Sequence, residues 1–218
     1  VVKINPNAVL HHHGYAIAIP SVVKENIGKN EPIDCLFFAR VCKDKGIEDL
    51  LEAISKIKKT VPSISLAVIG KADKKYLSEL NVLCDKLKIE SNVNFVGFLP
   101  KQADIYEYAL QAKLCVLPTH HDIISGTIIE SMFLKLPVVA YAVGGIPELN
   151  KMEETVRLVD KGNIEDLAQQ ITFLLNNKEE RKILAEKAYS LAQKRFNKND
   201  LIENDILKAY NLVISDLK

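Results

Sequence analysis

Short apolar segments alternate with amphipathic segments over most of this sequence, and that alternation restricts the fold more than any other feature. The apolar segments predict strands at 33–39, 65–69, 93–96, 114–117, 138–141 and 156–159. Apolar residues at helical spacing predict helices between and after these strands, at 47–57, 77–87, 101–112, 126–135, 164–174, 179–193 and 198–217. The order of elements is therefore strand, helix, strand, helix along most of the chain.

The predicted strands are almost wholly apolar, which is typical of strands buried on both faces of a parallel sheet. Alternating strands and helices with right-handed crossovers favour an α/β fold, a doubly wound parallel sheet of the Rossmann-like kind. Ligands of such sheets bind outside the carboxyl ends of the strands. The loops that follow the strands are therefore where a functional site is expected.

The chain divides into three parts by composition. Residues 1–32 contain prolines, glycines and three consecutive histidines at 11–13, and we interpret them as a linker with one short strand at 15–19. Consecutive histidines do not share one face of a helix or strand, so a metal site there is disfavoured. Residues 33–197 form the α/β domain, and residues 198–218 form a last helix.

Composition disfavours several classes of protein. The chain has 29 Lys and Arg against 28 Asp and Glu, so the basic excess typical of nucleic-acid binders is missing. It shows neither a signal peptide nor an apolar run of membrane-spanning length. The four cysteines have neither zinc-site nor C-x-x-C spacing, which disfavours metal and disulfides and favours a reducing, cytoplasmic setting. Cys35 and Cys115 fall in predicted strands, where a free thiol serves as a small core residue.

The loop after the first strand, Arg40 to Gly46, places three cations before a helix. Cations are unfavourable at the positive end of a helix, so a bound anion such as phosphate would explain Arg40, Lys43 and Lys45. Ordinary solvated lysines explain the pattern about as well. The loop carries neither the G-x-G-x-x-G dinucleotide motif nor a G-x-x-x-x-G-K-[ST] phosphate loop.

The loop after the fourth strand is the most informative segment. Ser125 is expected to be the N-cap of a helix that Gly126 begins, so that the amides of 125–127 and the Thr127 hydroxyl could hold a phosphate. Asp122 before the helix and Glu130 within it would flank that phosphate. The alternative is that Asp122 balances the helix dipole and Glu130 is a solvated helix residue.

The loop after the third strand is Gly97, Phe98, Leu99 and Pro100. A glycine here would let a planar base approach the main chain. Phe98 itself is expected to be a core residue more often than a stacking platform. In the loop after the fifth strand, the glycines at 144 and 145 are consistent with either a ligand contact or a tight turn.

Together these segments resemble the family 4 retaining glycosyltransferases. That family has the pattern G-R-x-x-x-x-K-G, V-x-F-x-G, E-x7-E-A-M-A-x-G-x-P-V-V-A and G-G-x-x-E in its C-terminal domain. The residues that match it here are Arg40, Lys45, Gly46, Val93, Phe95, Gly97, Asp122, Glu130, Ser131, Met132, Pro137, Val138, Val139, Ala140, Gly144, Gly145 and Glu148. The resemblance covers residues 3–217, and Asp122 replaces the usual first Glu.

The resemblance implies a role for each matching residue. Arg40 and Lys45 would neutralise the donor diphosphate, and Glu130 would hold the ribose. Asp122 would contact hydroxyls of the transferred sugar. The backbone at 97–99 would meet the nucleobase, and the amides of Ser125, Gly126 and Thr127 would meet the distal phosphate.

The resemblance also implies the function, that of the donor-binding half of a two-domain GT-B enzyme. Such an enzyme moves a sugar from a nucleotide-diphosphate sugar to a glycan or lipid acceptor, with surface polysaccharide synthesis as the expected pathway. No metal or other cofactor is expected, and the chain by itself is expected to be inactive. The acceptor site would lie on an N-terminal domain, which could also bring the cytoplasmic enzyme to the inner face of the membrane.

Two alternatives remain at this stage. The chain could belong to another GT-B enzyme, such as a sugar-nucleotide epimerase or a phosphorylase. It could also be a non-catalytic module that binds nucleotide sugars.

Overall fold

The computed structural model describes residues 32–123 and 125–197, together with Ile214. The predicted linker, apart from Pro32, lies outside this part of the chain, as do the three consecutive histidines. The predicted last helix is also outside it, apart from Ile214.

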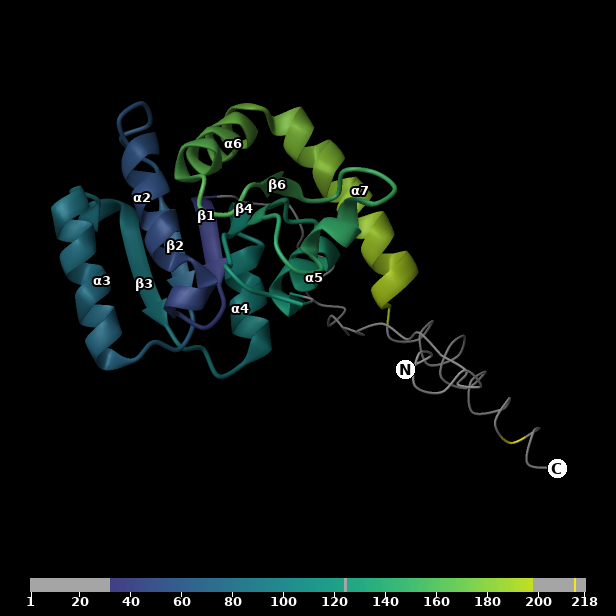
Figure 1. Cartoon of the computed structure of the whole chain (residues 1–218), viewed down its shortest axis with the longest axis horizontal. Helices are drawn as coiled ribbons and strands as arrows, with labels where there is room; N and C mark the ends of the chain where they lie inside the picture. The colour runs from purple at the N-terminus through teal and green to yellow at the C-terminus, as the bar shows by residue number, and fades with distance from the viewer. Residues whose placement is uncertain (1–31, 124, 198–213, 215–218) are drawn as a thin grey trace, which may run out of the picture.

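The described chain contains one parallel sheet of six strands in the order β3-β2-β1-β4-β5-β6 (Figure 1). This order and the helical crossovers confirm the predicted doubly wound, Rossmann-like α/β fold. The strands are β1 (Ile33–Phe38), β2 (Leu66–Ile69), β3 (Val93–Gly97), β4 (Ala112–Leu117), β5 (Val138–Tyr141) and β6 (Arg157–Val159).

Helices connect the strands and cover the sheet. They are α2 (Ile47–Ile57), α3 (Lys74–Leu87), α4 (Gln102–Ala109), α5 (Gly126–Phe133), α6 (Ile164–Asn176) and α7 (Lys178–Phe196), with 3-10 turns η1 (Lys43–Lys45), η2 (Glu90–Asn92) and η3 (Ile146–Asn150). Helix α2 packs against α3 and α6, and α5 packs against α7. Right-handed crossovers place α2 and α3 on one face of the sheet and α4 and α5 on the other.

Several helix boundaries differ from the expected ones, and for three of them the structure shows a local reason. Helix α3 begins earlier, because the Asp73 carboxylate accepts hydrogen bonds from the amides of Lys75 and Tyr76 and caps it. Helix α4 ends earlier, because Ala112 already pairs with Ile33 in the sheet. Helix α5 ends at Phe133, and Lys135 then adopts a left-handed backbone conformation with φ of 54°.

The capping of α6 is as expected. The Asn163 side chain accepts a hydrogen bond of 3.1 Å from the amide of Asp166.

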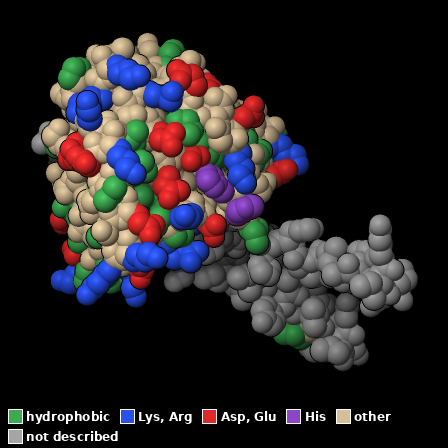
Figure 2. All heavy atoms as spheres, turned by 60° about the vertical axis from the view of Figure 1, so that its left-hand side comes forward, with side chains coloured by type: hydrophobic (Ala, Val, Ile, Leu, Met, Phe, Trp, Pro, Cys, Tyr) green, Lys and Arg blue, Asp and Glu red, His purple; other side chains and the backbone are tan. Residues whose placement is uncertain are grey.

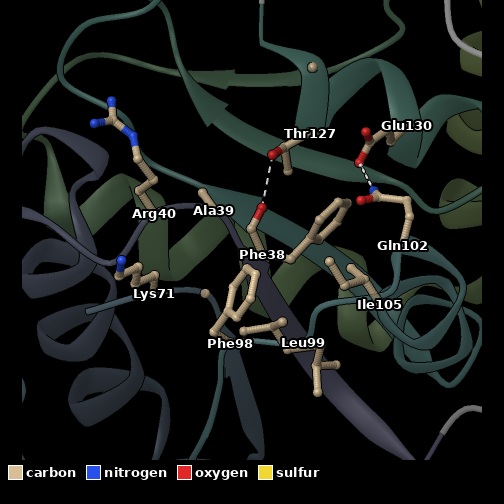
Figure 3. Close-up of a pocket in the computed structure, with 13 residues that line it drawn as sticks. Phe38, Ala39, Arg40, Lys71, Phe98, Leu99, Gln102, Ile105, Thr127 and Glu130 are labelled. Atoms are coloured by element: carbon tan, nitrogen blue, oxygen red, sulfur yellow. Dashed lines mark hydrogen bonds between the residues drawn. The ribbon is translucent and has the colours of Figure 1, made fainter. Parts of the chain in front are cut away.

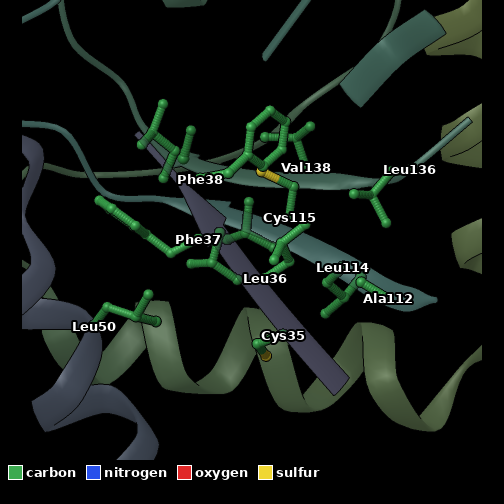
Figure 4. Close-up of a cluster of buried hydrophobic side chains, with 14 of the residues drawn as sticks. Cys35, Leu36, Phe37, Phe38, Leu50, Ala112, Leu114, Cys115, Leu136 and Val138 are labelled. Atoms are coloured by element: carbon green, nitrogen blue, oxygen red, sulfur yellow. The ribbon is translucent and has the colours of Figure 1, made fainter. Parts of the chain in front are cut away.

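The core lies around the central strands β1, β4 and β5. Leu36, Phe37, Leu114 and Cys115 of β1 and β4 are fully buried (Figure 4). Cys35 is also fully buried, and burial raises the pKa values of the Cys35 and Cys115 thiols, the latter to about 12. All four cysteines are free, so the expected role of Cys35 and Cys115 as small core residues is confirmed.

Gly46 connects the loop at the carboxyl edge of the sheet to α2. Its φ is +69°, and a Cβ atom there would lie 1.8 Å from the carbonyl oxygen of Pro118, directly after β4. The start of α2 can therefore approach the end of β4 only because residue 46 lacks a side chain.

We predict that Gly46→Ala lowers the free energy of unfolding by at least about 2 kcal/mol more than Gly162→Ala. Gly162 is a matched control, because its φ is +79° but a Cβ there would meet no atom within 4 Å. Both variants share the strain of a left-handed alanine, on the order of 1 to 2 kcal/mol, and only the first adds a collision with the main chain. Urea unfolding monitored by circular dichroism measures both. Equal losses would show that the close approach at Pro118 is not structurally important.

Candidate functional site

The strand order reverses between β1 and β4, and a pocket of about 260 Å³ opens beside this point at the carboxyl edge of the sheet. Its walls come from the ends of β1 and β2, the segment after β3, and the first turns of α4 and α5 (Figure 3). The lining residues are Phe38, Ala39, Arg40, Ile69, Gly70, Lys71, Phe98, Leu99, Gln102, Ile105, Gly126, Thr127 and Glu130. This is the crevice in which doubly wound sheets bind their ligands.

Two cations line this pocket. Within the described part of the chain, neither of them has an ion-pair partner. Arg40 follows β1 and Lys71 follows β2, and both side chains are exposed. The sequence predicted Arg40 as a site residue and missed Lys71. Its position in the sequence could have identified it, because Lys71 directly follows Gly70 at the carboxyl end of a predicted strand, where ligands are expected to bind.

The segment after β3 forms an apolar rim. Phe98 is 65% exposed, so the expectation that it would be a core residue is wrong. Gly97, with φ of +86°, turns the chain there, and its carbonyl oxygen accepts a hydrogen bond of 2.9 Å from the amide of Gly70. Phe98 lines both the main pocket and a smaller neighbouring one of about 170 Å³, which Gly97 also lines. A ring exposed to this extent offers a flat apolar face to a ligand.

The start of α5 has the predicted position but a different cap. Ser125 is the N-cap residue, as expected, yet its side chain makes no capping hydrogen bond. The first amides of α5 therefore lack the usual side-chain partner. The Thr127 hydroxyl donates a hydrogen bond of 2.8 Å to the carbonyl oxygen of Phe38, which fixes α5 to β1. Thr127 thus holds the helix in place and cannot donate that proton to a phosphate at the same time.

Glu130 lies within α5 and lines the same pocket, about one turn beyond Thr127. Its carboxylate accepts a hydrogen bond of 3.0 Å from the Gln102 side chain of α4 (Figure 3). Burial raises the pKa of Glu130 to about 7, and the hydrogen bond from Gln102 opposes that rise. Glu130 is therefore a partly desolvated carboxylate and not the freely solvated residue of the alternative interpretation.

Asp122 and Lys45 lie apart from the main pocket and contact each other. The Lys45 ammonium is 2.7 Å from Oδ2 of Asp122, and their side chains are only 17% and 13% exposed. Asp122 lines a second hollow of about 350 Å³, together with His120, His121, Ile123, Val143 and Gly144. Sequence reasoning placed both residues at the site but missed their ion pair, which joins segments that are far apart in the chain.

Gly144 allows the two loops around this hollow to approach each other. A Cβ atom at Gly144 would lie 1.6 Å from the carbonyl oxygen of Asp122. The next amide, that of Gly145, donates a hydrogen bond of 3.1 Å to the carbonyl oxygen of Ile123. The paired glycines therefore fix the backbone that carries Asp122.

An open parallel sheet with this strand order and a crevice at its reversal point defines a Rossmann-like ligand-binding domain. Comparison with known families makes the assignment specific. Residues 21–191 match the family model "Glycosyl transferases group 1", and the chain belongs to that family.

Individual relatives agree with this assignment. The capsular polysaccharide biosynthesis glycosyltransferase CapM of Staphylococcus aureus is 24% identical over 180 residues, which are 83% of this chain and 46% of CapM. The chain spans about half the length of such curated relatives.

Two solved structures share the fold. The C-terminal domain of the group 1 glycosyl transferase LpcC from Francisella tularensis has a TM-score of 0.70 at 21% identity, and the match covers 84% of this chain and 96% of that domain. HepE from Anabaena, solved in complex with UDP-glucose, has a TM-score of 0.74 at 23% identity, with 93% of this chain and 56% of HepE covered. The fold is therefore that of the C-terminal domain of GT-B glycosyltransferases. None of the helices in the described residues is both long enough and apolar enough to cross a membrane.

The raised pKa of Glu130 predicts a pH-dependent stability difference. The folded protein binds this proton more tightly than the unfolded chain, so wild type loses stability as the pH rises from about 4.5 to about 7. Glu130→Gln avoids that loss and should be more stable than wild type by about 1 to 3 kcal/mol at pH 8. The difference should decline towards pH 4.5.

Urea unfolding of both proteins between pH 4.5 and pH 8 measures this difference. Glu107→Gln, on an exposed part of α4, controls for the loss of one carboxylate. A constant difference between Glu130→Gln and wild type over this range would contradict the raised pKa.

Proposed function

We propose that this chain is the donor-binding domain of a retaining glycosyltransferase that transfers a sugar from a nucleotide-diphosphate sugar. The observation that carries the proposal is the charge arrangement at the reversal of strand order. There, Arg40 and Lys71 have no ion-pair partners in the described chain, and they line the same pocket as the uncapped first turn of α5. Free cations and free amides around one pocket suit a diphosphate.

The other walls of the pocket suit the remaining parts of a nucleotide. Phe98 offers an apolar face to the base, beside the main chain of Gly97 and Leu99. Glu130 accepts hydrogen bonds from the ribose hydroxyls, and Gln102 holds its carboxylate in position. The amides of Ser125, Gly126 and Thr127 bind the distal phosphate.

The transferred sugar then extends towards the second hollow. Asp122 uses Oδ2 to hold Lys45, and no described residue donates a hydrogen bond to its other oxygen, which can accept one from a sugar hydroxyl. Lys45, placed by Asp122, adds positive charge near the phosphate bonded to the sugar. Arg40, Lys45 and the helix amides stabilise the diphosphate as it leaves, so the reaction needs no metal ion.

The rest of the enzyme supplies the acceptor. We propose an N-terminal domain that binds a glycan or lipid acceptor and faces the carboxyl edge of this sheet. Surface polysaccharide synthesis is the pathway that the relationship to CapM suggests. Such an enzyme acts in the cytoplasm, and its N-terminal domain could contact the inner face of the membrane.

Removing one of the two pocket cations that lack an ion-pair partner in the described chain should weaken nucleotide binding. Arg40→Ala should raise the Kd for UDP, GDP or ADP, whichever wild type binds, by about ten- to a hundredfold, the effect of losing a charged hydrogen-bond partner. Lys45→Ala should have a smaller effect, because Asp122 already neutralises part of its charge.

Lys43→Ala is the matched control for these variants. It removes an exposed lysine of the same turn and should leave the Kd unchanged. Isothermal titration calorimetry measures all three variants. If neither Arg40→Ala nor Lys45→Ala changes the Kd of a nucleotide that wild type binds, the proposed diphosphate site is wrong.

The chain alone should bind donor but not transfer sugar. Catalysis requires donor and acceptor to be held together, and this chain supplies only the donor side of the cleft. Transfer assays with radiolabelled nucleotide sugars and a panel of glycan and lipid acceptors should show at most slow donor hydrolysis. Rapid transfer to any acceptor would contradict the proposed division between two domains.

A further inference from the structure

Three side chains from separate elements meet beside the second hollow. Asp49 lies in the first turn of α2, His120 in the loop after β4, and Tyr141 at the end of β5. Nε2 of His120 is 2.9 Å from Oδ2 of Asp49, and the Tyr141 hydroxyl donates a hydrogen bond of 2.8 Å to the same oxygen. The rings of His120 and Tyr141 are stacked, with centroids 6.0 Å apart and an interplanar angle of 16°.

This geometry defines the protonation pattern of the neutral His120 ring. A carboxylate oxygen only accepts hydrogen bonds, so the proton of the neutral ring is on Nε2. Nδ1 then carries a lone pair, and within the described residues it makes no hydrogen bond. The neutral His120 ring therefore has one hydrogen-bond acceptor that no described residue uses.

The backbone of His120 is also held in place. Its amide donates a hydrogen bond of 2.8 Å to the carbonyl oxygen of Asp44, and the neighbouring Thr119 hydroxyl donates to the same oxygen. The His120 side chain is 31% exposed and lines the hollow that Asp122 also lines. On the face shown in Figure 2, the coloured histidine side chains lie close together among acidic and basic side chains.

We propose that His120 is a specificity residue for the transferred sugar and that its Nδ1 accepts a hydrogen bond from a sugar hydroxyl. Asp49 and Tyr141 are positioning residues that hold the ring, and the Asp49 carboxylate keeps the proton of the neutral ring on Nε2. The inference rests on the proposed function, because a donor diphosphate held at the start of α5 extends its sugar towards the loop that carries His120 and Asp122. A fixed acceptor then distinguishes sugars by the place of their hydroxyl groups.

A purely structural role would use the same contacts. Asp49, His120 and Tyr141 connect α2 to two strand ends, and losing these contacts would destabilise the whole edge of the sheet. Such a loss would weaken free nucleotide and nucleotide sugar alike. The two roles can therefore be distinguished by the ratio of the Kd for free nucleotide to the Kd for the donor. A specificity role changes this ratio in a His120 variant, and a purely structural role does not.

The test uses two substitutions, each of which retains the hydrogen-bonding group near one of the two ring nitrogens. His120→Gln places an amide nitrogen near the position of Nε2 and keeps the hydrogen bond to Asp49, but it lacks the acceptor at Nδ1. His120→Asn places its amide near the position of Nδ1 and keeps an acceptor there, but it loses the contact with Asp49. Thermal unfolding confirms that each variant is folded before binding is measured.

Calorimetry on the full chain first selects the donor that wild type binds most tightly from UDP-glucose, UDP-N-acetylglucosamine, GDP-mannose and ADP-glucose. His120→Gln should raise the Kd for that donor by about three- to tenfold and leave the Kd for its nucleoside diphosphate unchanged. His120→Asn should bind the donor more tightly than His120→Gln does, although its melting temperature is lower.

Three results would overturn the inference and leave the proposed function intact. The first is an equal change in the Kd for donor and for free nucleotide in His120→Gln, and the second is no change in either. The third is binding of the donor by His120→Gln that is as tight as by His120→Asn, which would exclude Nδ1 as the acceptor. If wild type binds none of the four donors and none of their diphosphates, the proposed function fails and the inference fails with it.

Discussion

The reversal of strand order between β1 and β4 is the constraint on which the rest of this structure depends. Crossovers run in opposite directions from this point, so helices leave the carboxyl ends of β1 and β4 uncovered. The close approach of Gly46 to Pro118 and the hydrogen bond from Thr127 to Phe38 fix α2 and α5 on either side of the opening. The residues of the proposed site lie at strand ends, in loops and in the first turns of helices, which this arrangement brings to one edge of the sheet.

The proposed site contains several groups that are unfavourable by themselves. Arg40 and Lys71 lack ion-pair partners in the described chain, α5 begins without a side-chain cap, and Phe98 is exposed. Glu130 is partly desolvated, and its pKa is raised. A nucleotide would relieve each of them, since it brings negative charge, a planar base and hydroxyl donors. The stability that these groups cost the domain would then contribute to the free energy of binding.

Much of the fold was predictable from local patterns. The alternation of apolar and amphipathic segments indicated six strands and the doubly wound parallel arrangement, because strand burial and helix amphipathicity are both visible in the sequence. The cap at Asn163 was predictable from residue type, because the asparagine side chain can accept a hydrogen bond from the free amides at a helix start. The ends of α4 and α5 were not, since they depend on strand pairing at Ala112 and on the left-handed conformation of Lys135.

The site was predictable in position more than in detail. The Asp122 to Glu130 segment and Arg40 were visible as motifs. The ion pair between Lys45 and Asp122, the contact of Gln102 with Glu130, and the cluster of Asp49, His120 and Tyr141 all join segments distant in sequence. Local pattern carries no information on such contacts. Phe98 was wrongly expected in the core, because an aromatic residue beside a strand is usually buried. Here the turn at Gly97 leaves it exposed.

A crystal structure of this chain with a bound nucleoside diphosphate would test the central claim most directly. Our account predicts density in the pocket at the reversal of strand order. The diphosphate should lie between the Arg40 guanidinium and the first amides of α5, with the base against Phe98 and the ribose within hydrogen-bond distance of Glu130. A nucleotide bound elsewhere on the domain, or bound in this pocket with its phosphates away from both Arg40 and α5, would contradict it.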